Sequence, residues 1–316
     1  KVVRNNVIEL GLYPNEVMAY HDRVYVLCSG TAEILEIDPA DHSIRRRMAL
    51  PEGSNPYDMA VVGANRLYVS LLLSNTIAVV DLESGTVTKE IEVGIGPEGL
   101  LVDNTTAFVT NTALEGWSQC GQGTVSVIDI KTDSVTHTVP VPTNPQAIVK
   151  APDFNYYVVC TGDYMSESGK LVALSLYDAT WAYNPTVVDT FVVGGTPGDR
   201  VSLPSGDIYM TDWGDDQNGF VYRFDVFTQT VVADRNQPIR VAKGASRLLY
   251  DPVADDLYVS AFSQGAVHRL DPATGTIEET FPCNDGAHSM ALLEAIPETD
   301  PWADAVVAFN AGDPWS

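Results

Sequence analysis

Three short patterns recur along almost the whole chain of 316 residues, and this repetition limits the fold more than any other feature. The first is an aromatic or β-branched run, as in RLYVSLL, TAFVTNT and DIYMTDW. The second is a proline or small residue before a short apolar run, as in NPYDMAV and GPEGLLV. The third is an apolar run ending in aspartate. A repeat throughout the chain predicts a single domain, residues 1–316, built from similar units. The strand-ending aspartates lie 43 to 49 residues apart, at Asp38, Asp81, Asp129, Asp178, Asp225 and Asp271.

Each repeat is predicted to form four short antiparallel strands. Turn residues follow the strand-ending aspartate, whose side chain can accept hydrogen bonds from backbone N–H groups two residues on. Runs such as TIAVVDL and TVSVIDI are apolar on both faces, so each sheet is expected to be covered on both sides. Four strands in a period of about 40–50 residues are typical of a β-propeller blade.

Seven copies of the proline-led pattern predict an all-β, seven-bladed β-propeller with four-stranded antiparallel blades. The first 14 residues, KVVRNNVIELGLYP, are similar to the last strand of a blade, TVTKEIEVGIGP. We therefore expect the N-terminal strand to pair into blade 7 and close the ring, which would remove two exposed sheet edges.

The tetrads YVLC, YVSL, FVTN, YVVC, YMTD and YVSA resemble those of the YVTN-repeat family of β-propellers. FVTN, residues 108–111, is the nearest match, and the resemblance extends over nearly the whole chain. It implies a propeller of the exported bacterial or archaeal type. It implies little about function, because propellers of this kind serve as binding proteins, surface-layer parts and enzyme subunits.

The second and third strands of blades 3, 4 and 5 are joined by long loops. From the tetrad to the strand-ending aspartate these connections span 18, 18 and 13 residues, against 10 in blades 1, 2 and 6. They share one face with the crossings between blades, where Tyr57, Asp58 and Glu98 also lie, so this face is the expected binding surface. An alternative is that each aromatic ring covers only the end of its own blade. The predicted ligand- or partner-binding residues are Trp117, Asp163, Tyr164, Asp199, Arg200, Asp212, Trp213, Asp215, Asp216, Arg247 and His288.

The loop of blade 5, WGDDQNG, carries the acidic residues that a calcium ion favours. Its order D-x-x-D-D-x-N-G begins at Asp212 and lacks the alternating ligand spacing of an EF-hand loop. Asp212 also holds a repeat position that every blade fills. We therefore expect no metal or other cofactor, with a calcium ion in this loop as the alternative.

Four cysteines are predicted to lie near the same face and to form two disulfides. Cys28 and Cys160 hold the same repeat position on opposite sides of the ring, too far apart to pair with each other. Cys120 lies beside blade 4 and Cys283 beside blade 1, so the predicted pairs are Cys120–Cys160 and Cys28–Cys283. This pairing favours a periplasmic, cell-surface or secreted protein. The alternative is four buried free thiols.

The net charge is −24, from 18 Lys+Arg against 42 Asp+Glu. Such a surface repels phosphate backbones, so nucleic acid is not an expected partner, and no apolar run is long enough to span a membrane. No nucleophile elbow, metalloprotease motif or phosphate loop occurs. We therefore predict a non-enzymatic exported propeller that binds a small molecule or a protein. The alternatives are a metal-assisted hydrolase or lyase and a structural subunit of a cell-surface assembly.

Overall fold

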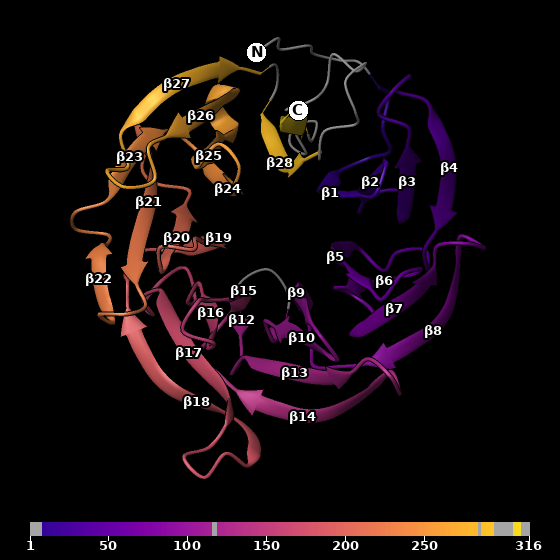
Figure 1. Cartoon of the computed structure of the whole chain (residues 1–316), viewed down its shortest axis with the longest axis horizontal. Coiled ribbons are helices and arrows are strands. Elements are labelled where there is room, and N and C mark those ends of the chain that lie inside the picture. Colours follow the sequence, from indigo (N-terminus) through magenta and orange to yellow (C-terminus); the bar gives the residue numbers. More distant parts are fainter. Residues whose placement is uncertain (1–7, 116–118, 284–285, 294–305, 311–316) are drawn as a thin grey trace.

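The computed structural model describes residues 8–115, 119–283, 286–293 and 306–310. Its regular structure consists of β-strands and one short 3-10 helix, η1 (Phe262–Gln264). Figure 1 shows the sheets arranged radially around a central axis, with the first strand of each sheet innermost. This is the architecture of a β-propeller, and it confirms the predicted fold type.

Six antiparallel sheets have four or more strands. The first contains β1 (Pro14–Tyr20), β2 (Arg23–Cys28), β3 (Glu33–Ile37) and β4 (Ile44–Ala49), and the second contains β5 (Pro56–Val62), β6 (Arg66–Leu71), β7 (Thr76–Asp81) and β8 (Thr86–Glu92). The third contains β9 (Pro97–Asp103), β10 (Thr106–Asn111), β13 (Thr124–Asp129) and β14 (Ser134–Pro140). A separate two-stranded hairpin pairs β11 (Leu114–Glu115) with β12 (Gln119–Cys120).

The fourth sheet contains β15 (Pro145–Lys150), β16 (Tyr156–Cys160), β17 (Lys170–Tyr177) and β18 (Tyr183–Val192). The fifth contains β19 (Pro197–Ser202), β20 (Asp207–Asp212), β21 (Asn218–Asp225) and β22 (Thr230–Ala233), and β23 (Ile239–Ala242) also pairs with β21. The sixth contains β24 (Ala245–Asp251), β25 (Asp256–Ala261), β26 (Ala266–Leu270) and β27 (Ile277–Pro282).

Two predictions about the ring are wrong. The described residues form six sheets of at least four strands rather than seven, because β28 (Ala287–Leu292) and β29 (Val306–Asn310) make a two-stranded sheet. The described part of the N-terminal segment does not close the ring as a strand. Residues 8–13 form no strand, and residues 1–7 lie outside the described part of the chain. The side chains of Ile8 and Leu10 instead pack against the buried cluster between the first sheet and β28.

The sector between the sixth and the first sheets is occupied by β28, which lies between β24 and β1 in Figure 1. Ala291, near the end of β28, packs in the cluster of Val17 on β1. Met290, its neighbour in the strand, packs in the cluster of Tyr258 on the sixth sheet. Adjacent side chains of a strand point to opposite faces, so β28 joins the two sheets.

The same alternation builds the core between the other sheets. On β6, Leu67 and Val69 pack toward the first sheet, whereas Tyr68 between them packs toward the third. All three side chains are fully buried. Burial on both faces explains why the middle strands read as continuous apolar runs, and it confirms the prediction that each sheet is covered on both sides.

The third residue of several tetrads has a structural role in shaping the inner strands. The hydroxyl of Ser70 accepts a hydrogen bond from the backbone N–H of Asp58 (2.9 Å) and donates to the carbonyl of Glu98 on the next sheet (2.7 Å). Thr211 and Ser260 accept the equivalent N–H groups of Asp199 (3.1 Å) and Arg247 (3.0 Å). A β-bulge lies at this point of each of these inner strands. The bulge changes the direction of the side chains within and next to it. Asp58, Asp199 and Arg247 thereby point toward the axis.

The strand-ending aspartates form the predicted turns. Each side chain accepts a backbone N–H from two or three residues further on, at 2.7–2.9 Å in the shortest bond of each turn. These bonds hold the pKa of Asp81, Asp178, Asp225 and Asp271 below the usual range. The repeat of aspartate therefore reflects local turn chemistry.

Candidate ligand site in the central channel

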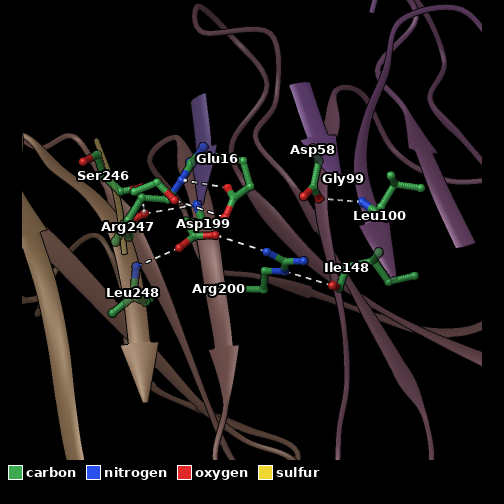
Figure 2. Close-up of polar contacts among 12 residues, drawn as sticks. Glu16, Asp58, Gly99, Leu100, Ile148, Asp199, Arg200, Ser246, Arg247 and Leu248 are labelled. Atoms are coloured by element: carbon green, nitrogen blue, oxygen red, sulfur yellow. Dashed lines mark hydrogen bonds and ion pairs between the residues drawn. The ribbon is translucent and has the colours of Figure 1, made fainter. Parts of the chain in front are cut away.

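A polar cavity of about 220 Å³ lies where the innermost strands meet. Figure 2 shows its charged side chains converging from β1, β5, β19 and β24. Charged groups at the centre of a domain are rare, because burying a charge is costly unless it is paired. The cavity is lined by Glu16, Asp58, Met59, Leu100, Asp199, Arg200, Arg247, Leu248, Ser289 and Met290.

Two of the lining aspartates join neighbouring sheets through equivalent hydrogen bonds. Asp58 accepts the backbone N–H of Leu100 on β9 (2.8 Å), and Asp199 accepts that of Leu248 on β24 (2.7 Å). Asp199 also lies 3.2 Å from the guanidinium of Arg200, whose Nε donates to a backbone carbonyl of β15. Burial nevertheless raises the pKa of Asp58. Both carboxyl groups are held rigidly by the scaffold.

Arg247 and Glu16 face each other less tightly. Arg247 Nε lies 3.8 Å from Glu16 Oε2, too far for a hydrogen bond, and this buried nitrogen has no hydrogen-bond partner. Glu16 Oε1 accepts a hydrogen bond from the hydroxyl of Ser289 on β28 (3.1 Å). Burial raises the pKa of Glu16 to about 8 despite the opposing effect of Arg247. Burial lowers the pKa of Arg247, whereas the carboxylates of Asp199 and Glu16 raise it. The net effect is a raised pKa.

Glu98, on β9, is a buried acidic residue whose carboxyl is only partly satisfied by hydrogen bonds. It is 4% exposed, and its Oε2 has no hydrogen-bond partner. Tyr57 on β5 and Arg247 on β24 are its electrostatic neighbours, and Glu98 is not among the residues that line the cavity. Burial raises the pKa of Glu98 to about 8, and Arg247 only partly opposes this rise.

Aromatic side chains lie on the face formed by the loops and crossings. Tyr164 is exposed, and its hydroxyl accepts a hydrogen bond from the Gln146 side chain of β15 (2.8 Å). Trp213 is about half exposed and packs on Phe262 (ring centroids 5.7 Å apart), which in turn contacts the edge of His288. Burial lowers the pKa of His288 to about 3, so its ring is neutral near pH 7, and its Nδ1 is buried without a partner.

The structure brings together only part of the predicted binding residues. Asp199, Arg200 and Arg247 line the cavity, whereas Tyr164 and Trp213 lie in exposed loops. Asp163 and Asp215 accept backbone N–H groups of their own loops, which lower the pKa of both carboxyls. Trp117 lies outside the described residues, and Asp216 is exposed.

Glu16 and Ser289 are cavity residues that the sequence prediction missed. Glu16 is the second residue after Pro14, the same position that Asp58 holds after Pro56. That repeat position, read across all inner strands, is the signal that could have found it.

Asp212 has a structural role. It is 3% exposed and accepts hydrogen bonds from the backbone of Thr196 and Gly214 and from the Tyr222 hydroxyl, at 2.6–2.8 Å. We expect Asp212→Ala to lower the free energy of unfolding by at least about 2 kcal/mol, because it leaves buried donors without an acceptor. Asp216→Ala should change it by less than about 0.5 kcal/mol. Urea unfolding followed by tryptophan fluorescence measures both. Equal effects would contradict the structural role of Asp212.

The two predicted disulfides are not present. Cys28, Cys160 and Cys283 are free thiols, and the side chain of Cys120 lies outside the described residues. Cys28 is buried in the cluster between the first sheet and β28, whereas Cys283 packs against the cluster on the sixth sheet's side of β28. Sharing one face of the ring therefore does not bring the two thiols together. Burial raises the pKa of Cys28 to about 11, so its thiol is protonated at pH 7.

Among the described residues, no three or more His, Cys, Asp or Glu side chains are grouped so that they could hold a metal ion. None of the helical structure in this part of the chain is long and apolar enough to cross a membrane.

Comparisons with known proteins place the chain by fold only. No protein-family model matches the sequence, and no curated protein matches it. Among solved structures, hydrazine synthase from Kuenenia stuttgartiensis superimposes with a TM-score of 0.75 at 16% sequence identity, over 98% of this chain and 96% of that chain. A streptogramin B lyase structure gives a TM-score of 0.64 at 11% identity, over 88% and 87% of the two chains. Identities this low carry no activity from one propeller to another. The chain is thus similar to known β-propellers in fold, while its function must be argued from its own channel.

Proposed function

We propose that this protein is a binding propeller that holds a small polar molecule in the central channel. The observation that carries the proposal is a cavity of about 220 Å³ whose charged lining is incompletely paired. At about 30 Å³ for each water molecule, this volume holds a ligand the size of about seven waters. The ligand would enter from the face that carries Tyr164 and Trp213.

The energetics of the lining support a functional role. If the channel served only stability, apolar side chains would stabilise the fold more, because a buried ion pair often stabilises less than a hydrophobic replacement of similar volume. Here burial raises the pKa of Glu16 to about 8 and also raises the pKa of Asp58. Titratable groups perturbed in this way, gathered around a cavity, are a common feature of binding and active sites.

Binding is favoured over catalysis for a specific reason. Asp58 and Asp199 use their carboxyl oxygens to accept backbone N–H groups, and neither carboxyl forms a hydrogen bond with a hydroxyl or thiol of the described residues that line the cavity. The cavity lining offers one hydroxyl, on Ser289, and it contacts Glu16 and the backbone of Val17. Export of the protein stays a prediction. Because Cys28, Cys160 and Cys283 are free thiols, the resemblance of the tetrads to the YVTN-repeat family is the remaining support for it.

A panel of small amines, amino acids, carboxylates and sugars tests the proposal through the ligand-induced rise in Tm. At least one class should stabilise the wild type at about 1 mM, and Arg247→Lys should weaken that binding about tenfold or more, because lysine lacks the planar guanidinium. Arg47→Lys, on the outer strand β4, is the matched control and should bind like the wild type. If no class binds, or if both variants bind equally well, the channel is not a ligand site.

A further inference from the structure

Arg247 lines the cavity with hydrogen-bond donors that the described part of the protein does not use. Its guanidinium donates no hydrogen bond to any described residue, and its Nε is buried without a partner. Its one ion pair within the described part of the chain is with Glu16, at 3.8 Å. The side chain is 19% exposed and lines the cavity, so its Nη groups remain available to a ligand there.

Two other arginines show what a half-buried guanidinium pairs with in this protein. Arg223, 23% exposed, forms a fork with both oxygens of Asp207, at 2.7 and 3.0 Å. Arg66, 34% exposed, contacts both oxygens of Asp133, at 2.9 and 3.0 Å. Arg247 is less exposed than either and has no described carboxylate at such a distance. Because a planar guanidinium fits a carboxylate in this way, the partner that it lacks is an acceptor of that shape.

The aspartates of the lining already have hydrogen-bond donors of their own. Asp58 accepts two backbone N–H groups, at 2.7 and 2.8 Å. Asp199 accepts one backbone N–H group at 2.7 Å and lies 3.2 Å from the guanidinium of Arg200. Among the described residues neither aspartate forms an ion pair with Arg247. The cavity therefore has spare donors on Arg247, and the group that a ligand can add is an acceptor.

Glu16 is a weak partner for this guanidinium. Its Oε2 lies too far away for a hydrogen bond, and its Oε1 accepts one from the Ser289 hydroxyl of β28 (3.1 Å). The charged groups that influence Glu16 are Asp58 from β5, Asp199 from β19 and Arg247 from β24. Burial has the largest effect and raises the pKa of Glu16 to about 8, which favours its neutral form at pH 7. A neutral acid does not compete strongly for Arg247.

We propose that the ligand of this channel carries a carboxylate group, which binds the guanidinium of Arg247 and replaces Glu16 as its nearest partner. This inference rests on the proposed function, since it names the chemical class that the same cavity takes. A carboxylate accepts two parallel N–H groups of a guanidinium. Its single negative charge also suits this lining better than the higher charge of phosphate, which Asp58 and Asp199 would repel more strongly.

Binding of a carboxylate is expected to depend on pH through Glu16. While Glu16 is neutral, it leaves the guanidinium to the ligand. Above pH 8 it ionises and repels the bound anion, so the affinity falls by up to about tenfold per pH unit. Two other groups keep their charge state across this range. The pKa of Arg247 is raised, and burial lowers that of His288 on β28 to about 3.

Calorimetric titration with acetate, lactate, ethylamine and inorganic phosphate tests the inference, at pH 6, 7, 8 and 9 and constant ionic strength. We expect acetate or lactate to bind at pH 6 and 7 and to bind up to about tenfold more weakly at pH 9. Ethylamine should not bind, and phosphate should bind more weakly than the carboxylates.

Two variants assign the effect to particular side chains. Arg247→Lys should weaken carboxylate binding about tenfold or more at pH 7, whereas Arg47→Lys on β4 should leave it unchanged. Glu16→Gln cannot ionise, so it should remove the loss of affinity at pH 9. Glu92→Gln, on the exposed outer strand β8, is its matched control and should keep that loss. The Tm of each variant shows that it folds.

The outcomes separate this inference from the proposed function. Binding of ethylamine or phosphate in preference to the carboxylates, with dependence on Arg247, would keep the small-ligand site and overturn the carboxylate assignment. Carboxylate binding that Arg247→Lys leaves intact would also overturn it, as would a pH dependence that Glu16→Gln leaves intact. The absence of binding by all four probes overturns the carboxylate assignment, and the wider panel of compounds then decides whether the channel binds any ligand.

Discussion

Replacing Arg247 by methionine is expected to lower the free energy of unfolding by about 3–5 kcal/mol at pH 7. Methionine keeps much of the side-chain volume, but it leaves the carboxylates of Asp199 and Glu16 without the cation whose pKa they raise. A buried carboxyl group that stays ionised without this cation is costly. The loss should become smaller at pH 5, where proton uptake costs less.

Chemical denaturation at the two pH values measures this effect, and Arg247→Lys is the matched control. Lysine retains the positive charge, so it should recover most of the lost stability even though it lacks the fork of donors. If Arg247→Met is as stable as the wild type at both pH values, the guanidinium does not compensate the channel carboxylates.

Replacing Glu98 by glutamine is expected to stabilise the protein, and the gain should increase with pH. Burial raises the pKa of Glu98 from 4.5 to about 8 in the folded protein. Below pH 4.5 the acid is neutral in both the folded and unfolded states. Between pH 4.5 and 8 the unfolded state ionises first, so the wild type loses up to about 1.4 kcal/mol of stability per pH unit. Glutamine has the same shape and cannot ionise, so the variant avoids this loss.

The measurement is the difference in unfolding free energy between Glu98→Gln and the wild type at pH 5, 6, 7 and 8. Glu92→Gln, at an exposed position, should give a difference that stays flat across this range. A flat difference for Glu98→Gln as well would show that its carboxyl is ordinary in the folded protein. A gain in stability combined with a loss of ligand binding would be typical of a functional residue retained at a cost in stability.

Much of the blade could be predicted because its determinants are local. The Asp225 turn, the alternation of Leu67, Tyr68 and Val69, and the apolar middle strands all depend on residues close in sequence. The third tetrad residue is an informative case. Its recurring hydroxyl could be seen in the sequence, but the reason for it, a hydrogen bond across a bulge, needed the structure.

The candidate site could be predicted only in part. The long loops indicated the binding face, whereas the residues that line the cavity belong mainly to the inner strands. The long loops hold Asp163 and Asp215, and their carboxyl groups serve the loops' own turns. Asp199, Arg200 and Arg247 were found because they lie in crossings and inner strands. Glu16 was missed because the second position after the proline was not compared across all the inner strands.

Residues close together in the sequence set the repeat and the strand pattern within each sheet, and both could be predicted from it. Local hydrogen bonds and the two-residue period of a strand suffice for these features. The number of complete sheets, the separation of the thiols and the charges that meet in the channel depend instead on contacts between distant segments. Ser289 and Glu16 are 273 residues apart and still form a hydrogen bond. Such contacts depend on how the whole ring assembles, because the position of each inner strand around the axis depends on the packing of all the sheets between them.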